Sequence, residues 1–329
     1  MKTSESLSAS RRALLIGAAG SALGSAWPAC AQAWPAKPVR VIVNSAPGGL
    51  TDVVARLVGM KMSAALGQQL VVDNRPGAAG LVGAEALSKA EPDGYTLGIF
   101  ASAITVAPSL MPGTTFDPTK DLAPITLLMS TPMLLVTNLN SPYRTVAQVV
   151  ADAKARPGQL PVASGGNATM THLVAEQFQV EAGVNLIHVP YKGGAPALND
   201  LLAGQVNLYF DTLNTSVKLV QEGRLRALAI VAPQRSPALP DVPTMVEAGY
   251  PGVQGNAWFA LFAPAAAPPA VLARLSEEAN KALAAPDVRE RMTSMGATVE
   301  GGSPKALSDL IRSEVPRWSR LVRDRSIKM

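Results

Sequence analysis

Short apolar segments rich in β-branched residues alternate along this chain with longer segments of helical spacing. In the first part, strands are predicted at 39–43, 70–72 and 95–99, with helices at 52–66 and 82–90 between them. Two more strand-like runs follow at 125–129 and 133–136. Strands that alternate with helices in this way indicate an α/β fold with a mainly parallel sheet and right-handed crossovers.

The same order of elements then begins again. It predicts helices at 146–154, 170–180 and 196–202, and strands at 160–163, 186–189, 206–210 and 226–231. We therefore expect a second lobe over residues 137–235. The Pro-rich stretch 236–244 would return the chain to the first lobe, where 258–262 adds a strand and the rest is predicted to be helical.

The C-terminal segment has the pattern of one amphipathic helix. Ser303 is placed to cap it, Pro304 suits its first turn, and Pro316 would kink it. Its apolar stripe is expected to be core, and comprises Leu307, Leu310, Ile311, Val315, Trp318, Leu321 and Val322. These last helices have no obvious place in the second lobe. We expect them on the first, which then consists of residues 34–136 and 236–329, with a hinge at the two crossings.

Composition and charge exclude several classes of protein. With 48% hydrophobic and 16% charged residues, the chain suits a compact fold rather than a disordered one. The formal charge is +5, and removal of Lys2, Glu5, Arg11 and Arg12 with the first 33 residues leaves +3. A balance this small gives no argument for a nucleic-acid partner.

Residues 1–33 have the pattern of a signal peptide. Arg11 and Arg12 precede an apolar stretch that is about half the length needed to span a bilayer, and small-x-small cleavage sites follow. We expect export to the periplasm, by a twin-arginine or an ordinary secretory route. Cleavage would leave Cys30 behind, and Trp27 and Pro28 argue against a lipid anchor on that cysteine. The later uncharged runs, 122–143 and 248–273, are interrupted by prolines, so the mature chain is not expected to insert into a membrane.

Two similar Gly-rich turns each lie between a predicted strand and its helix. The first follows the strand at 39–43 and contains Ala46, Gly48, Gly49 and Thr51; the second follows the strand at 160–163 and contains Ser164, Gly166, Asn167 and Thr169. Ligands bind at the carboxyl ends of parallel strands, where helix N-termini favour anions. Neither turn contains Arg or Lys, so we predict one carboxylate per lobe, held by neutral donors. The alternative is two ordinary turns, with Thr51 or Asp52 and Thr169 or Thr171 as helix caps.

Motifs of common enzyme classes are absent from the sequence. There is no Gly-x-x-x-x-Gly-Lys-Ser/Thr, Gly-x-Ser-x-Gly or His-Glu-x-x-His, and no metal site is expected from two histidines. His172 and His188 are therefore interpreted as structural histidines rather than catalytic bases. Asp211 ends a predicted strand, where it could accept a hydrogen bond from a ligand or cap the next helix, and both roles stay open.

Several motifs in order along the chain resemble the Bug family, the extracytoplasmic solute receptors of tripartite tricarboxylate transporters. They are Lys37-Pro38-Val39-Arg40-Val41-Ile42-Val43, Ala46-Pro47-Gly48-Gly49, Thr51-Asp52, Asn74-Arg75-Pro76-Gly77, Pro92-Asp93-Gly94-Tyr95-Thr96-Leu97, His188-Val189-Pro190-Tyr191-Lys192-Gly193 and Asp241-Val242-Pro243-Thr244. The match covers nearly all of the mature chain. It is specific for the family and not for a ligand.

The resemblance implies a two-lobed periplasmic binding protein of type II-like form, with helices flanking the sheet of each lobe. It places the family's binding loops at 46–51 and 164–169. Ala163, Ala168 and Met170 stand where the family often has glycine, which predicts a narrower or reshaped pocket. Ser102, after the third strand, belongs to a wall that is more apolar here than in the family.

These observations predict a monomeric periplasmic receptor that captures a small organic carboxylate by lobe closure. The acid is expected to be a dicarboxylate or an aromatic or aliphatic monoacid, and neither a cofactor nor a metal is required. Its partners would be the membrane subunits of a tripartite tricarboxylate transporter. The alternatives are a receptor for a membrane sensor and, less favoured, an exported enzyme that uses Asp211 or His172 as a base.

Overall fold

The computed structural model describes residues 34–111 and 113–328, of which those from Lys37 onward belong to one compact unit. The expected signal peptide, residues 1–33, lies outside the described residues, and so do Arg11, Arg12 and Cys30. No helix in the described ranges combines the length and the apolar character that a membrane span requires.

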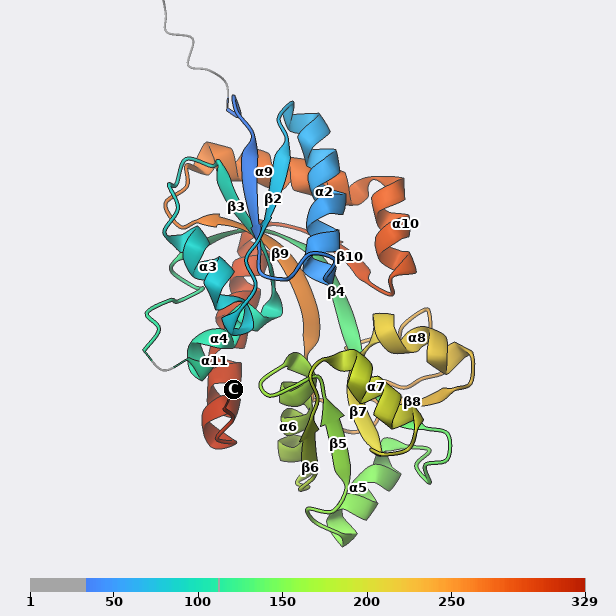
Figure 1. The fold of residues 1–329 in the computed structure, drawn as a ribbon. Helices are drawn as coiled ribbons and strands as arrows, with labels where there is room; N and C mark the ends of the chain where they lie inside the picture. Colours follow the sequence, from blue (N-terminus) through green and yellow to red (C-terminus); the bar gives the residue numbers. More distant parts are fainter. Residues whose placement is uncertain (1–33, 112, 329) are drawn as a thin grey trace, which may run out of the picture. The chain divides into compact units, whose positions relative to one another are not determined.

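The first lobe is built on a mixed sheet in the order β2-β1-β3-β9-β4, with β10 also paired to β4. Its helices connect the parallel strands β1, β2 and β3 (Figure 1). The elements from the first part of the chain are β1 (Val39–Val43), α2 (Leu50–Leu66), β2 (Leu70–Asn74), η1 (Ala78–Gly80), α3 (Leu81–Ser88), β3 (Thr96–Ala101), η2 (Ser102–Thr105) and α4 (Ala107–Leu110).

The second lobe repeats this plan with a sheet in the order β4-β7-β5-β6, to which β8 adds by pairing with β4. The strands β5, β6 and β7 are parallel, as the alternation of strands and helices predicts. Its elements are α5 (Val146–Ala155), β5 (Pro161–Ser164), α6 (Met170–Ala182), β6 (Ile187–Pro190), α7 (Gly194–Leu202), β7 (Leu208–Thr212), α8 (Leu213–Gln221) and β8 (Leu225–Val231).

One strand, β4 (Leu122–Asn138), belongs to both sheets, where two separate strands were predicted. It pairs with β9 as far as Pro132 and with β7 and β8 from Met133 onward. Proline cannot donate to a ladder, and Pro132 stands where β4 changes partners, so it interrupts neither sheet. The first crossing therefore lies between Pro132 and Met133, not after residue 136.

The return crossing also differs from the expected boundary after residue 235. The N–H of Met245 donates to the carbonyl of Ile230 on β8, and Met245 and Val253 pack in a core cluster with residues of the second lobe. β9 (Asn256–Pro264) then pairs with β3 and β4 in the first sheet. The Pro-rich stretch thus packs on the second lobe, and the chain returns at Gly255 and Asn256.

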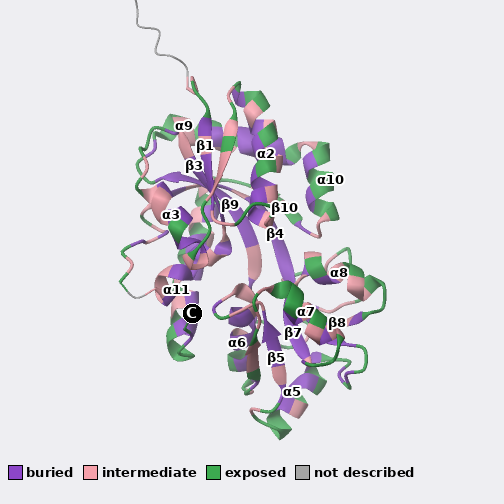
Figure 2. Ribbon diagram, viewed as in Figure 1, coloured by how far each residue is buried: buried purple, intermediate pink, exposed green. Residues whose placement is uncertain are grey.

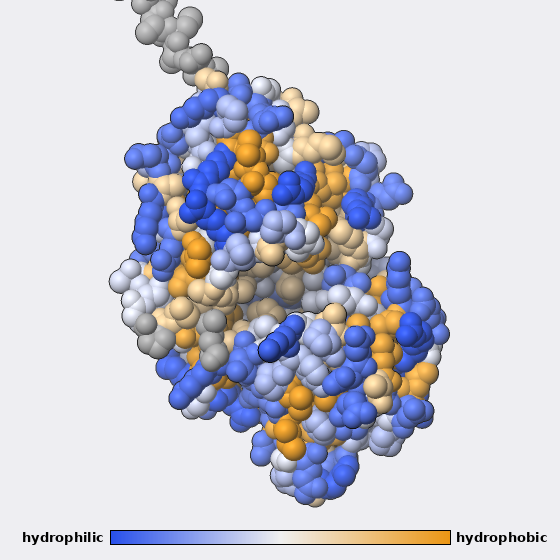
Figure 3. All heavy atoms as spheres, in the orientation of Figure 1, coloured by the Kyte–Doolittle hydropathy of each residue, from blue (hydrophilic) through white to orange (hydrophobic). Residues whose placement is uncertain are grey.

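The strand directions make the carboxyl ends of the parallel strands in the two lobes face each other. β1 and β3 run in the same direction as the first half of β4, because both β3 and β4 are antiparallel to β9. In the second lobe, β4 is antiparallel to β7, so β5, β6 and β7 run back toward the first lobe. Figure 3 shows the surface hollowed between the two lobes.

The C-terminal part adds α9 (Pro269–Ala284), α10 (Pro286–Ser294), β10 (Thr298–Gly301) and α11 (Pro304–Asp324). Of these, β10 was not predicted. As expected, Ser303 caps α11 by accepting from the N–H of Ala306, and Pro304 occupies its first turn. The helix continues through Pro316.

Helix α11 packs on both lobes, which corrects the expectation that it belongs to the first alone. Its first half, with Leu307 and Ile311, joins the core of the first lobe. Its second half, with Trp318, Leu321 and Val322, packs into the cluster that contains second-lobe residues such as Phe178. The apolar stripe is therefore core, as predicted, but of two lobes. Figure 2 shows the central strands of both sheets largely buried and the outer helix faces exposed.

Candidate functional site

The first predicted turn connects β1 to α2 and leaves the start of that helix open. Gly49 is the N-cap residue, and within the described chain no side chain caps α2. Gly48 has φ +79°, a left-handed conformation that glycine adopts without strain, and it is exposed. The first N–H groups of α2 are consequently available to an acceptor other than the chain's own side chains.

Asp52 holds this turn from the inside. Its Oδ2 accepts from the N–H of Gly48 at 3.0 Å, Arg56 donates to both of its oxygens, and Asn74 donates to Oδ1. The hydrogen bond from Arg56, followed by those from Gly48 and Asn74, outweighs burial and lowers the pKa of Asp52 to about 2. This carboxylate is therefore ionised and fully engaged in holding the turn.

The second predicted turn connects β5 to α6 and has the same open helix start. Thr169 is the N-cap residue, yet its hydroxyl contacts the Gly166 carbonyl and Thr171 Oγ1, and in the described structure no side chain caps α6. Thr171 Oγ1 also accepts from the N–H of Gly165 at 2.8 Å. Ala168 has φ +59°, although it carries a Cβ.

Two stacked histidines hold the second turn. The rings of His172 and His188 are nearly parallel, with centroids 3.7 Å apart. His172 Nδ1 accepts from the N–H of Ala168 at 3.0 Å, and His188 Nε2 lies 2.6 Å from Ser164 Oγ. Since Nδ1 accepts, the single ring proton of His172 is on Nε2, which lies 3.5 Å from Glu176 Oε1. Both histidines are structural, as the sequence analysis interpreted them.

The environment of His188 favours a neutral imidazole. Burial, reinforced by the neighbouring His172, lowers the pKa of His188 to about 4. Burial alone would raise the pKa of Glu176, but hydrogen bonds from His172 and Arg325 lower it to about 2. Arg325, the residue directly after α11, places its Nε 2.5 Å from Glu176 Oε2.

Asp211 is buried and 3% exposed, at the end of β7. Its Oδ2 accepts from the hydroxyls of Thr215 and Ser216 in the first turns of α8. Burial raises the pKa of Asp211 despite these hydrogen bonds. These contacts fix Asp211 against the start of α8, but the N-cap residue of that helix is Thr212 and no side chain caps it, so the capping expectation is not met and ligand binding by Asp211 stays a prediction.

The ten predicted residues form two groups, and among the described residues no hydrogen bond joins one group to the other. In the first lobe, Ser102 is buried in η2, whose N-cap residue Ala101 donates to the side chain of Asn44 just before the first turn. Ala46 and Gly48 are exposed, whereas Thr51 is buried. In the second lobe, Ser164 is buried, Gly166 and Thr169 are partly buried, and Asn167 is exposed.

Sequence reasoning missed the residues that support the turns. Thr171 holds Gly165, His188 contacts Ser164, and Tyr209 lies beside both Thr171 and Asp211. Burial raises the pKa of Tyr209, so its phenol stays protonated. The position of Asp52 and His172, four residues after Gly48 and Ala168, was the one local signal. His188 and Tyr209 come from the neighbouring strands β6 and β7 and carry no local pattern.

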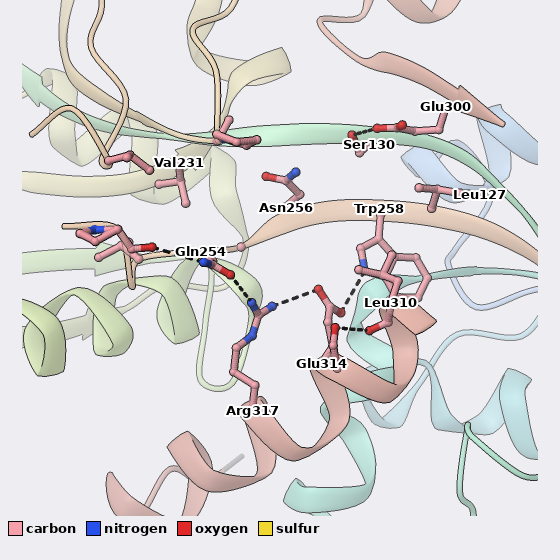
Figure 4. A pocket seen from close by; sticks show the side chains of 17 residues that line it. Leu127, Ser130, Val231, Gln254, Asn256, Trp258, Glu300, Leu310, Glu314 and Arg317 are labelled. Atoms are coloured by element: carbon pink, nitrogen blue, oxygen red, sulfur yellow. Dashed lines mark hydrogen bonds and ion pairs between the residues drawn. The ribbon is translucent and has the colours of Figure 1, made fainter. Parts of the chain in front are cut away.

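A separate cavity of about 430 Å³ lies at the crossings and contains none of the ten predicted residues. Figure 4 shows Glu314 between Trp258 and Arg317, with Arg317 also bonded to Gln254 on the return crossing. Burial raises the pKa of Glu314, against the hydrogen bond from Trp258. Most of the polar side chains labelled in this cavity are hydrogen-bonded to one another. These contacts connect α11 to the return crossing.

Comparison with known proteins identifies the family. The model of the tripartite tricarboxylate transporter family receptor matches residues 54–327. Protein BugT of Bordetella pertussis is 37% identical over 296 residues, which cover 89% of this chain and 91% of BugT.

Solved structures share the fold. Rpa4515 of R. palustris with adipate has a TM-score of 0.76 at 33% identity, covering 90% of this chain and 99% of that one. MatC from Rhodopseudomonas palustris with bound malate has a TM-score of 0.74 at 35% identity, covering 88% of this chain and all of that one. The expected α/β fold of a two-lobed binding protein is confirmed.

Proposed function

Since this chain belongs to the tripartite tricarboxylate transporter receptor family, we propose that it captures a small organic carboxylate between its two turns and delivers it to the membrane subunits of such a transporter. The family consists of periplasmic binding proteins, and the expected signal peptide at 1–33 would export this member. The adipate and malate of the two related structures indicate the class of ligand to test.

The observation that carries this proposal is the pair of open helix starts at facing sheet ends. Gly49 and Thr169 begin α2 and α6 without side-chain caps in the described part of the chain, so both helices present free N–H donors. A helix N-terminus carries about half a positive charge and suits a carboxylate. Each lobe supplies one such site, and a dicarboxylate would engage both.

Binding would favour the closed arrangement because only there do both turns contact one ligand. The two crossings, at Pro132 and Met133 and at Gly255 and Asn256, are the places for the hinge. A micromolar dissociation constant corresponds to about 8 kcal/mol, which a few charge-assisted hydrogen bonds and a buried carbon chain supply.

A thermal-shift screen of organic acids, with adipate and malate included, tests the proposal. A ligand at about 100 times its dissociation constant adds about 2.7 kcal/mol and should raise the Tm by roughly 5 to 11 °C. No shift across a broad carboxylate panel would contradict it, and recovery of a chemically altered acid would indicate an enzyme instead.

Substitutions in each turn test the location of the site. A Cβ at Gly49 would meet Ala46 O and Ser45 Oγ at 3.1 Å, so Gly49→Val displaces the turn. Thr169→Val removes two hydrogen bonds without changing side-chain volume. Both variants should bind the identified acid about tenfold more weakly or worse. Val180→Thr, at an exposed position on α6, is the control and should bind normally. Normal binding by both turn variants would place the site elsewhere.

A further inference from the structure

The second turn depends on an acceptor that a single proton can abolish. The N–H of Ala168, a residue in the left-handed region, donates to the ring nitrogen Nδ1 of His172. A protonated imidazole has no acceptor, because both of its nitrogens then carry hydrogen. A proton on His172 Nδ1 would therefore face the Ala168 N–H as donor against donor, and the turn would lose the contact that orients it.

The surroundings concentrate this effect on the histidine pair. Within residues 34–111 and 113–328, the charged groups that face the two rings are Glu176 on α6 and, through Glu176, Arg325 after α11. The Glu176 carboxylate is shared between His172 and Arg325, so its charge is already paired. The rings stack at 3.7 Å, which disfavours two protons on the pair.

The first turn has no corresponding weakness. The residue before its N-cap, Gly48, donates to the carboxylate of Asp52, which Arg56 keeps ionised. Mild acid therefore leaves the first turn intact. The Gly48 amide is for this reason an internal reference for the Ala168 amide.

We propose that His172, supported by His188, is the positioning residue of the second turn, and that protonation of this pair loosens the turn and releases the bound acid as the pH falls below neutrality. The release of the acid rests on the function proposed above. The loosening of the turn does not, because it is argued from the contacts of His172 alone. The low pKa of His188 agrees with it, since His188 resists protonation while the turn is formed.

Two substitutions at His172 separate positioning from general packing. The amide oxygen introduced by His172→Asn can occupy the place of Nδ1 and accept from Ala168 without titrating. The longer side chain introduced by His172→Gln places its amide near the position of Nε2, toward Glu176, and leaves the Ala168 N–H unpaired. His172→Asn should therefore rescue the turn and His172→Gln should not.

Residue-resolved hydrogen exchange on the ligand-free protein tests the loosening directly. After correction for intrinsic rates, protection of the Ala168 amide relative to Gly48 should fall about tenfold between about pH 7.5 and pH 5 in the unmodified protein. In His172→Asn the ratio should stay constant. An unchanged ratio in the unmodified protein would overturn the proposal, whether or not any acid binds.

Calorimetric binding of adipate or malate at the same two pH values tests the consequence for the ligand. The unmodified protein should lose about tenfold more affinity than His172→Asn on acidification, and protonation of the acid itself cancels in that ratio. His172→Gln should bind weakly at both values. Equal losses in the unmodified protein and His172→Asn would overturn the proposal while leaving carboxylate binding established. Failure of both acids to bind would count against the proposed function, and the exchange experiment would still decide the role of His172.

Discussion

The two turns use the same backbone arrangement but side chains of opposite chemistry. In each, the third residue of the helix, Asp52 or His172, accepts at 3.0 Å from the N–H of the residue before the N-cap. That donor residue, Gly48 or Ala168, has a left-handed conformation in both turns. The arrangement resembles a capping box displaced by one residue, and it leaves the N-cap itself free.

The partners four residues further along each helix show where the turns differ. Asp52 is paired with the cation Arg56, whereas His172 lies beside the carboxylate of Glu176. An ionised carboxylate stays an acceptor to low pH, whereas an imidazole stops accepting once both nitrogens are protonated. On the proposal above, the same geometry is insensitive to pH in the first lobe and sensitive to it in the second.

The largest effect is expected from removal of the carboxylate in the first turn. Asp52→Ala removes a buried carboxylate together with the hydrogen bonds that it accepts from Gly48, Asn74 and Arg56, and should cost roughly 2 to 3 kcal/mol of unfolding free energy. Denaturant unfolding at neutral pH measures it.

Arg56→Ala is the matched control for this substitution. The Arg56 side chain is 56% exposed, and its loss leaves the bond between Gly48 and Asp52 in place, so the cost should stay below about 1 kcal/mol. An equal cost for both variants would mean that the ion pair, rather than the buried acceptor, holds the first turn.

An intermediate effect is expected from pH. Since burial, together with His172, lowers the pKa of His188 from 6.5 to about 4, the unfolded chain binds a proton in this window and the folded chain does not. This stabilisation is complete well above pH 6.5 and is lost as the pH drops to about 4. The full shift corresponds to about 3 kcal/mol, and because His188 is only partly buried we expect a loss of about 1 to 2 kcal/mol. Unfolding curves collected across this range measure the loss.

His188→Gln should remove most of the fall in stability between pH 6.5 and pH 4, because the glutamine amide does not titrate. Asp52 contributes to a separate window: its pKa is lowered from 3.8 to about 2, so its stabilisation is complete above 3.8 and is lost toward 2. If His188→Gln keeps the full slope between pH 6.5 and 4, another group is responsible and the contrast between the turns fails.

The smallest effect is expected from exchanging the residue types before the two N-caps. Ala168→Gly relieves the left-handed strain at φ +59° and should stabilise the protein by about 0.5 kcal/mol. Gly48→Ala introduces that strain at φ +79°, where a Cβ has no atom within 4 Å, and should cost about 1 kcal/mol. Thermal unfolding measures the change in stability of both variants. If both changes had the same sign, the two turns would not correspond.

Much of the fold could be predicted from local pattern. The strand at Val39–Val43 has the predicted bounds, and α6 and β8 differ from theirs by one or two residues, because hydrophobic periodicity and Gly-rich boundaries are local properties. The positions of the two turns followed from the same pattern, and the family resemblance agreed with them. Binding by the ten site residues is still a prediction.

Other features depended on contacts that no local window contains. Nothing near Pro132 indicates that β4 continues from one sheet into the other, because that depends on β7, β8 and β9 as partners. The apolar stripe of α11 is equally suited to one lobe or two. Its packing against α6 was decided by the position of α6 in the folded chain.

The sequence by itself determined where most helices, strands and turns lie and that two similar lobes exist, because these follow from the spacing of side chains along a few residues. The tertiary structure alone decided that His188 stacks on His172, since the parallel pairing of β5 with β6 places His188 beside Val162, close to Ser164 on the same strand. Acceptor strength and proton affinity arise from such packed neighbours, so the chemical difference between the two turns could be derived only from the folded chain.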